Sequence, residues 1–144
     1  METQQLHRGR LIDHVQLVVE DIAASKRFYQ AVLGTLGIPV ISLTDDFFVA
    51  DELCVSSADS EAAQGRLTGR VHLAFQAADE AQVTAFYKVG LKNGGTDNGR
   101  PGTRSYHPGY FAAFLLDPDG NNIEAVYHGQ ATRSAESVVI EFEA

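Results

Sequence analysis

Hydrophobic and polar residues alternate along the segment 11–19, and this pattern is typical of a β-strand because successive side chains of a strand point to opposite faces. One face of this predicted strand is apolar, and the opposite face carries His14. In the next segment, 22–36, apolar residues recur at the spacing of one face of a helix. The pattern therefore predicts a strand followed by an amphipathic helix.

The same pattern returns when the chain is shifted by 58 residues. The coinciding residues are His14 and His72, Leu17 and Phe75, Asp21 and Asp79, Phe28-Tyr29 and Phe86-Tyr87, Leu33 and Leu91, and Gly37 and Gly95. The second copy predicts a strand over 71–77 and a helix over 80–93. In each copy an aspartate precedes the helix as a candidate N-cap, and the Phe-Tyr pair is expected to pack in the core.

Short strand-like runs follow each helix: PVISL, FFVAD and LCVSS after the first, YFAAFLL and NIEAVYH after the second. The turn DPDGNN between the last two runs is typical of a hairpin. The sequence thus predicts an α+β fold in a single domain, with modules over about residues 10–57 and 70–128 and a linker at 58–69. The tail 129–144 contains SVVIEFEA, which could add a strand within the chain or to a partner.

Composition narrows the possible functions. The 144 residues include 11 Lys and Arg against 19 Asp and Glu, a net charge of −8, which argues against binding to nucleic acid or to an anionic membrane. The sequence has no apolar run long enough to span a membrane, and its polar N-terminus lacks the apolar core of a signal peptide. The single cysteine, Cys54, excludes an internal disulfide. We expect a cytoplasmic domain that acts on a small molecule.

Candidate chemistry follows from the strand faces. Alternation in the segment 122–128 places Glu124 on the face type that carries His14 and His72. If the two halves curl together, two imidazoles and one carboxylate converge and form a site for a divalent transition metal with open positions. Taken singly, each histidine could instead be only hydrogen-bonded and the glutamate only solvated.

At this point the sequence resembles a known family. The motifs HVQLVVEDIAASKRFYQAVLGTLG, GRVHLAFQAADEAQVTAFYKVGLKNGG and FLLDPDGNNIEAV are similar to those of the vicinal oxygen chelate superfamily, which includes glyoxalases, bleomycin resistance proteins and ring-cleaving dioxygenases. The resemblance covers about residues 10–128. It implies two βαβββ modules whose curled mixed sheets enclose one cavity, as in the glyoxalase, bleomycin resistance and dihydroxybiphenyl dioxygenase-like fold.

The resemblance also implies a set of functional residues and partners. His14, His72 and Glu124 match three of the family's metal ligands, for a divalent ion such as Zn, Fe, Ni or Mn. Family relatives often form homodimers, sometimes by exchanging modules, so a homodimer is expected.

One departure from the family concerns a fourth ligand, usually a glutamate late in the first half. The matching stretch here is ELCVSS, with Leu53, Cys54 or Val55 in the candidate position and Glu52 out of phase. Cys54 could bind a metal as thiolate or act as a small hydrophobic residue. This departure bears against true glyoxalase chemistry.

The glycine-rich loop GGTDNGRPGTRSYHPGY offers further candidates. Tyr106 and His107 could exchange a proton with a substrate, and Arg104 could bind a substrate carboxylate. Tyr110 is a second candidate substrate-binding residue. The alternative is a structural flap in which these residues only pack and pair. His128 lies on the same strand face as Glu124, but at the end of the strand and thus at the rim of the candidate site.

Three functions stay open at the level of the sequence. The first is a glyoxalase-like lyase or isomerase that uses a divalent metal to chelate vicinal oxygens of a small substrate. The second is a ring-cleaving dioxygenase that uses non-heme iron in the same triad. The third is a metal-free protein that binds a small molecule or drug, as resistance proteins do.

Overall fold

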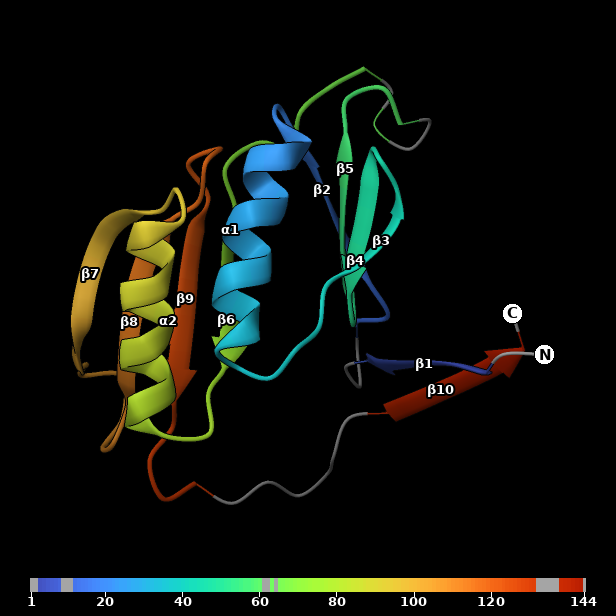
Figure 1. Ribbon diagram of the computed structural model, residues 1–144. Coiled ribbons are helices and arrows are strands. Elements are labelled where there is room, and N and C mark those ends of the chain that lie inside the picture. The colour runs from blue at the N-terminus through green and yellow to red at the C-terminus, as the bar shows by residue number, and fades with distance from the viewer. Residues whose placement is uncertain (1–2, 9–11, 61–62, 64, 132–137, 144) are drawn as a thin grey trace.

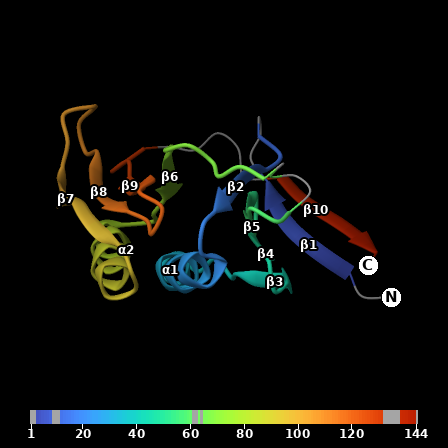
Figure 2. The same ribbon diagram turned by 90° about the horizontal axis from the view of Figure 1, so that it is seen from above.

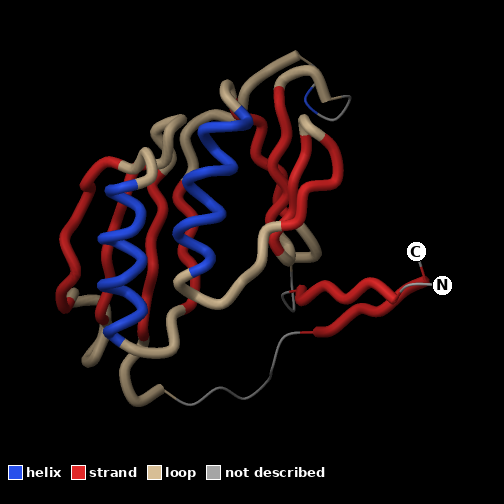
Figure 3. Tube along the Cα trace, in the orientation of Figure 1, coloured by secondary structure: helices blue, strands red, loops and turns tan. Residues whose placement is uncertain are grey.

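The computed structural model describes residues 3–8, 12–60, 63, 65–131 and 138–143. Parts of the predicted linker (61–62 and 64) and of the predicted tail (132–137 and 144) therefore lie outside the described residues. The helices and strands form two similar blocks along the chain. Figure 3 shows the helices in blue and the strands in red.

Two βαβββ units follow one another along the chain. The first consists of β2 (Val15–Val19), α1 (Ile22–Gly34), β3 (Ile41–Thr44), β4 (Phe47–Ala50) and β5 (Leu53–Ser57). The second consists of β6 (His72–Gln76), α2 (Glu80–Lys92), β7 (Thr96–Thr103), β8 (Phe111–Leu116) and β9 (Asn122–Tyr127). The predicted α+β fold with two such modules is confirmed.

Each unit forms a mixed four-stranded sheet, in the orders β2-β5-β4-β3 and β6-β9-β8-β7. In both, the first strand pairs in parallel with the last, and the other pairings are antiparallel. The crossover helix accounts for this parallel pair, since parallel neighbours need a long connection. The two sheets stay separate within the described residues, so they do not close into one barrel.

The two helices lie side by side and cover the same side of the two sheets (Figures 1 and 2). Asp21 caps α1 by accepting a hydrogen bond from the backbone of Ala24, and Asp79 caps α2 in the same way from Gln82. Both helices begin at the predicted residues. They end one or two residues earlier than predicted, because the last residues form turns rather than helix.

A single core joins the modules through the helices. Phe28, Tyr29 and Phe86 are fully buried in it, as the pattern of the Phe-Tyr pairs predicts, whereas Tyr87 is partly buried. Helix α2 comes very close to β8 at Gly90, where an added Cβ would lie 2.2 Å from Leu115 Cδ1. A larger residue at this position would therefore require the buried Leu115 side chain to shift.

The two ends of the chain form a separate ribbon. Strands β1 (Thr3–Arg8) and β10 (Val138–Glu143) pair in antiparallel fashion and extend away from both sheets (Figures 1 and 2). The tail thus supplies its strand within the chain, which is one of the two alternatives left open by the sequence. The pattern of residues 3–8 does not predict β1. None of the described helices is long and apolar enough to span a membrane.

Candidate functional site

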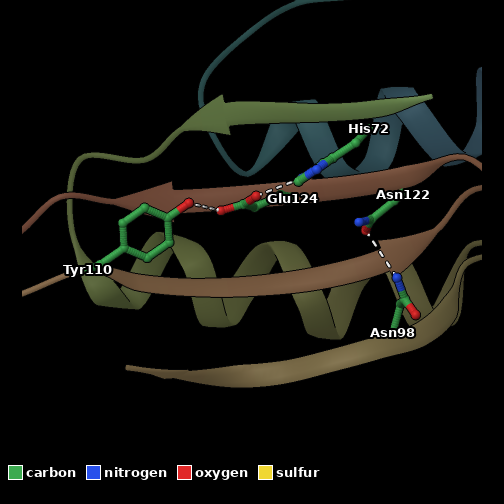
Figure 4. Close-up of polar contacts among 5 residues, drawn as sticks. All are labelled: His72, Asn98, Tyr110, Asn122 and Glu124. Atoms are coloured by element: carbon green, nitrogen blue, oxygen red, sulfur yellow. Dashed lines mark hydrogen bonds and ion pairs between the residues drawn. The ribbon is translucent and has the colours of Figure 1, made fainter. Parts of the chain in front are cut away.

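His72 and Glu124 meet on the face of the second sheet that points away from the helices. They project from the neighbouring strands β6 and β9, where Ala74 pairs with Glu124. His72 Nε2 lies 2.7 Å from Glu124 Oε1 (Figure 4). A proton must lie between an imidazole nitrogen and a carboxylate oxygen at this distance, and a cation could take its place.

Glu124 is the buried member of this pair. Its side chain is only 2% exposed, whereas 53% of the His72 side chain is exposed. A buried carboxylate needs hydrogen-bond donors. Tyr110 supplies one, because its hydroxyl donates to the other oxygen, Oε2 (Figure 4). In this pair Glu124 is therefore buried and held by a hydrogen bond, whereas His72 is accessible to solvent.

Tyr110 stays protonated at neutral pH. Burial and the hydrogen bond to Glu124 raise the pKa of its phenol to about 12. The hydroxyl is thus a permanent donor to the carboxylate over the whole range in which most proteins are folded.

His14 does not join this pair in the structure. Its imidazole is exposed, and Nδ1 lies 2.7 Å from Asp13 Oδ1 just before β2 in the other module. Among the described residues, no three His, Cys, Asp or Glu side chains gather in a group that could hold a metal. One chain therefore brings together two of the three predicted metal ligands.

The repeat identifies the residue of the first module that corresponds to Glu124. The 58-residue shift places Gln16 on Ala74, and the parallel pairings set Gln16 opposite Cys54 and Ala74 opposite Glu124. Cys54 thus takes in the first module the place that Glu124 takes in the second. It is a buried cysteine outside any disulfide, where the second module has a carboxylate.

The loop before β8 brings several aromatic and imidazole rings onto Tyr110. The centroid of the Tyr106 ring lies 4.9 Å from that of Tyr110, although Tyr106 is 72% exposed. His107 and His128 each lie with their ring centroid 5.3 Å from that of Tyr110. His107 Nε2 is 2.9 Å from His128 Nδ1. His128, a rim candidate in the sequence, thus belongs to the same cluster as the predicted proton-transfer residues.

Arg104 lies on the same face of the sheet. Its Cζ is 5.3 Å from the centroid of the Phe114 ring, and Phe114 pairs with Glu124 across β8 and β9. The guanidinium donates to the backbone oxygens of Arg100 and Thr103, at 2.7 and 3.3 Å. Within the described part of the chain these bonds use two of its five N–H groups, and a guanidinium has further donors that could bind an anion.

A second polar pair on this face was missed by the sequence interpretation. Asn98 Nδ2 donates to Asn122 Oδ1 at 3.1 Å, which links β7 to β9 across β8 (Figure 4). Asn122 is in phase with Glu124 along β9, and this phase was the available signal. The partner on β7 was missed because the sequence interpretation took residues 94–110 as a glycine-rich loop, which is wrong for 96–103, the residues of β7. This strand is irregular, with two register shifts against β8.

Comparisons with known proteins support the fold and the family. The profile of the Glyoxalase/Bleomycin resistance protein/Dioxygenase superfamily matches residues 11–125. A glyoxalase/bleomycin resistance protein from Albidiferax ferrireducens T118 is 35% identical, with a TM-score of 0.63 over 81% of this chain and 97% of that chain. No curated protein matches the chain.

Two further solved structures are similar. A glyoxalase/bleomycin resistance protein/dioxygenase family enzyme from Burkholderia phytofirmans PsJN is 24% identical, with a TM-score of 0.62 over 79% of this chain and 95% of that chain. A glyoxalase-related enzyme from Fulvimarina pelagi is 18% identical, with a TM-score of 0.62 over 88% of this chain and 99% of that chain. At these sequence identities the two structures support the fold alone. The profile match and the relative at 35% identity show that the chain belongs to the Glyoxalase/Bleomycin resistance protein/Dioxygenase superfamily.

Proposed function

We propose that this protein is a glyoxalase-like metalloenzyme of the lyase or isomerase type. The observation that carries the proposal is the contact between His72 Nε2 and Glu124 Oε1, at 2.7 Å on the open face of the second sheet. An imidazole nitrogen and a carboxylate oxygen are ligands that divalent transition metals accept, including Zn, Fe, Ni and Mn. A bound ion would replace the proton that the two atoms share and would lie about 2.0–2.2 Å from each of them.

A bound divalent metal would supply Lewis-acid polarisation of two vicinal oxygens of a small substrate. The residues of this chain have separate tasks around it. His72 and Glu124 would bind the ion, and the Tyr110 hydroxyl donates a hydrogen bond to the other oxygen of Glu124. Because Glu124 is buried and anchored while His72 is exposed, substrate would approach from the His72 side.

The third ligand is proposed to be His14 of a second copy. Within the described part of one chain His14 lies apart from the other two, yet it is exposed and matches His72 in the repeat, one residue before β2 begins. A homodimer that sets the first module of one copy against the second module of the other would join the three ligands.

The substrate and its protons are assigned to the loop before β8. Arg104 has further N–H donors on the face that carries Glu124, so it would bind a substrate carboxylate. Tyr110 stands beside it as a second contact. Tyr106 and His107 lie next to Tyr110 and would carry a proton to or from the substrate.

Elemental analysis of the purified protein tests this function, with Glu124→Gln, His72→Ala and Glu80→Gln as matched variants. We expect stoichiometric metal in the wild type and in Glu80→Gln, whose carboxylate is exposed at the start of α2. Glu124→Gln and His72→Ala should lose the metal. Full metal occupancy in His72→Ala would contradict the proposal. Iron with oxygen uptake on catechols would instead favour the dioxygenase.

One observation favours a metal-free binding protein as the second candidate. An apolar groove of roughly 190 Å³ lies between the modules, where Val15, Leu33 and Leu73 contribute to its lining. A groove of this kind suits a hydrophobic ligand. If the protein binds no metal after reloading but takes up a hydrophobic dye with micromolar affinity, the binding function replaces the enzymatic one.

A further inference from the structure

We propose that Tyr110 is a positioning residue that reserves Oε2 of Glu124, so that this carboxylate offers only Oε1 to the metal. The pair His107–His128 holds Tyr110 in that place. This inference rests on the proposed metal site and adds how the buried ligand is presented to the ion.

The two carboxylate oxygens of Glu124 have different partners. Oε1 faces His72 Nε2, and Oε2 accepts the hydroxyl of Tyr110 (Figure 4). With its side chain 2% exposed, Glu124 has no room to turn both oxygens toward solvent. The oxygen on the His72 side is therefore the one that an ion can reach.

Tyr110 is itself fixed in place. The backbone N–H of Tyr110 donates to the carbonyl of His107 at 3.2 Å, and its own carbonyl accepts from Arg104 at 2.8 Å. Its ring is in contact with the rings of Tyr106, His107 and His128, at centroid distances of 4.9, 5.3 and 5.3 Å. The hydroxyl is thus held on Glu124 by contacts along the whole side chain.

The hydrogen bond between the two imidazoles has a defined direction. His107 Nδ1 lies 2.9 Å from the carbonyl oxygen of Pro108, which can only accept, so Nδ1 carries a hydrogen. In the neutral ring, Nε2 of His107 is then the acceptor, and His128 Nδ1 donates to it at 2.9 Å. This bond ties the loop that carries Tyr110 to the end of β9, the strand that carries Glu124.

The consequence for the site is an open coordination position. A carboxylate that binds through both oxygens fills two positions, and one that binds through a single oxygen leaves a place for a substrate oxygen. Outer contacts of this kind orient metal ligands, and their loss commonly weakens metal affinity by about 10–100-fold.

Titration with Co²⁺, followed by visible absorption, tests the inference in the full-length protein. The variants are Tyr110→Phe, His128→Phe and, as the matched control, Tyr87→Phe. Tyr87 also donates its hydroxyl to a carboxylate, Asp97 at 2.9 Å, but on α2 and away from the site. Circular dichroism confirms that each variant is folded.

We expect Tyr110→Phe to change the Co²⁺ absorption bands and to weaken affinity by about 10–100-fold, because Oε2 is released. His128→Phe keeps a ring but loses the hydrogen bond, so it should shift both readouts in the same direction and by less. Tyr87→Phe should match the wild type.

If Tyr110→Phe matches the wild type as well, the role of Tyr110 is wrong while the metal site stands. If only His128→Phe is silent, the role of the imidazole pair is wrong. A wild type that binds no Co²⁺ overturns both this inference and the proposed function.

Discussion

At the scale of single residues, Asp117 is a buried acidic side chain with several hydrogen bonds. The residue is 4% exposed, and its carboxylate accepts from the Tyr29 hydroxyl at 2.5 Å and from the Asn121 side chain at 2.9 Å. The backbone N–H groups of Asp119 and Asn121 add two more bonds. Burial, followed by the neighbouring Asp117, raises the pKa of Tyr29 well above its usual value. This cluster ties α1 of the first module to the turn that precedes β9, and thus to the strand of Glu124.

Removal of the Tyr29 hydroxyl should therefore lower stability. Tyr29→Phe leaves the buried carboxylate of Asp117 one donor short, and hydrogen bonds to charged groups contribute about 1.5–3 kcal/mol. We expect a loss of that size in the free energy of unfolding, measured by urea denaturation. Tyr87→Phe removes a similar bond at the surface and should cost much less. Equal losses in the two variants would show that burial of the pair does not matter.

The phenol of Tyr110 predicts a dependence of stability on alkaline pH. Its pKa is about 12 in the folded protein against a usual value of 10.0, so the folded state holds this proton more tightly than the unfolded state does. The stabilising contribution is complete below pH 10 and is lost as the pH rises toward 12. Urea midpoints measured from pH 8 upward should show the wild type losing more of its stability in this range than Tyr110→Phe. Parallel curves would contradict the raised pKa, because the other four tyrosines are present in both proteins.

At the scale of elements, the loop before β8 is held against the turn after β9 by two glycines as well as by two histidines. Gly109 and Gly129 both have positive φ angles, of 86° and 73°. An added Cβ on Gly129 would lie 3.0 Å from the carbonyl oxygen of Gly109 and 3.1 Å from its Cα. The two backbones therefore touch, which brings the Tyr110 loop onto the strand of Glu124.

Gly129→Ala should separate these two segments. The left-handed backbone alone costs an alanine about 1–2 kcal/mol, and the backbone of Gly109 cannot yield as a side chain would. Gly65→Ala is a matched control, since Gly65 has the same φ of 73° but nothing within 4 Å of an added Cβ. We expect a larger loss of unfolding free energy in Gly129→Ala, together with shifted NMR signals of Tyr110. Equal losses would mean that the contact between the glycines is not important.

At the scale of the whole molecule, the two modules share a core but present the candidate ligands on different sheets. Cross-links between the modules are made by the backbone of Glu20, which donates to Asp119 at 3.0 Å, and by the Val18 N–H, which donates to Thr68 in the segment between the modules at 2.7 Å. These bonds join the modules, and within the described part of one chain His14 lies apart from His72 and Glu124. The site proposed above would therefore be built between two copies.

This proposal predicts complementation between inactive variants. His14→Ala and Glu124→Gln should each bind no metal alone. When the two are unfolded together and refolded as a mixture, the mixed dimers should hold one intact site each, and total metal should reach about one quarter of the wild-type level. The pair His72→Ala with Glu124→Gln is the control, because both changes lie in the same half of the site and no intact site can form. Absence of metal in both mixtures would contradict a site shared between copies.

The two modules and the faces of their strands follow from the local pattern of apolar and polar residues. Periodicity of two and of 3.6 residues reports only which side of a local element is apolar. Hence the repeated strand and helix, the N-caps Asp21 and Asp79, and the face shared by His72 and Glu124 could be predicted without coordinates. The strand β7 could not, because its residues were interpreted as part of a glycine-rich loop, and the full βαβββ order was implied only by the family resemblance. The burial of Phe28, Tyr29 and Phe86 followed from the same local rule, whereas Tyr87 is only partly buried.

Only the tertiary structure decided how distant segments meet. The contact of Tyr110 with Glu124, the pair His107–His128 and the bridge between Asn98 and Asn122 each join residues from different elements through loops and register shifts. The predicted enclosure of one cavity also depended on the packing of the sheets, which stay apart here. Local periodicity contains no information on loop geometry, on β-bulges or on the placement of one sheet against another. These three features decide which residues meet at the site.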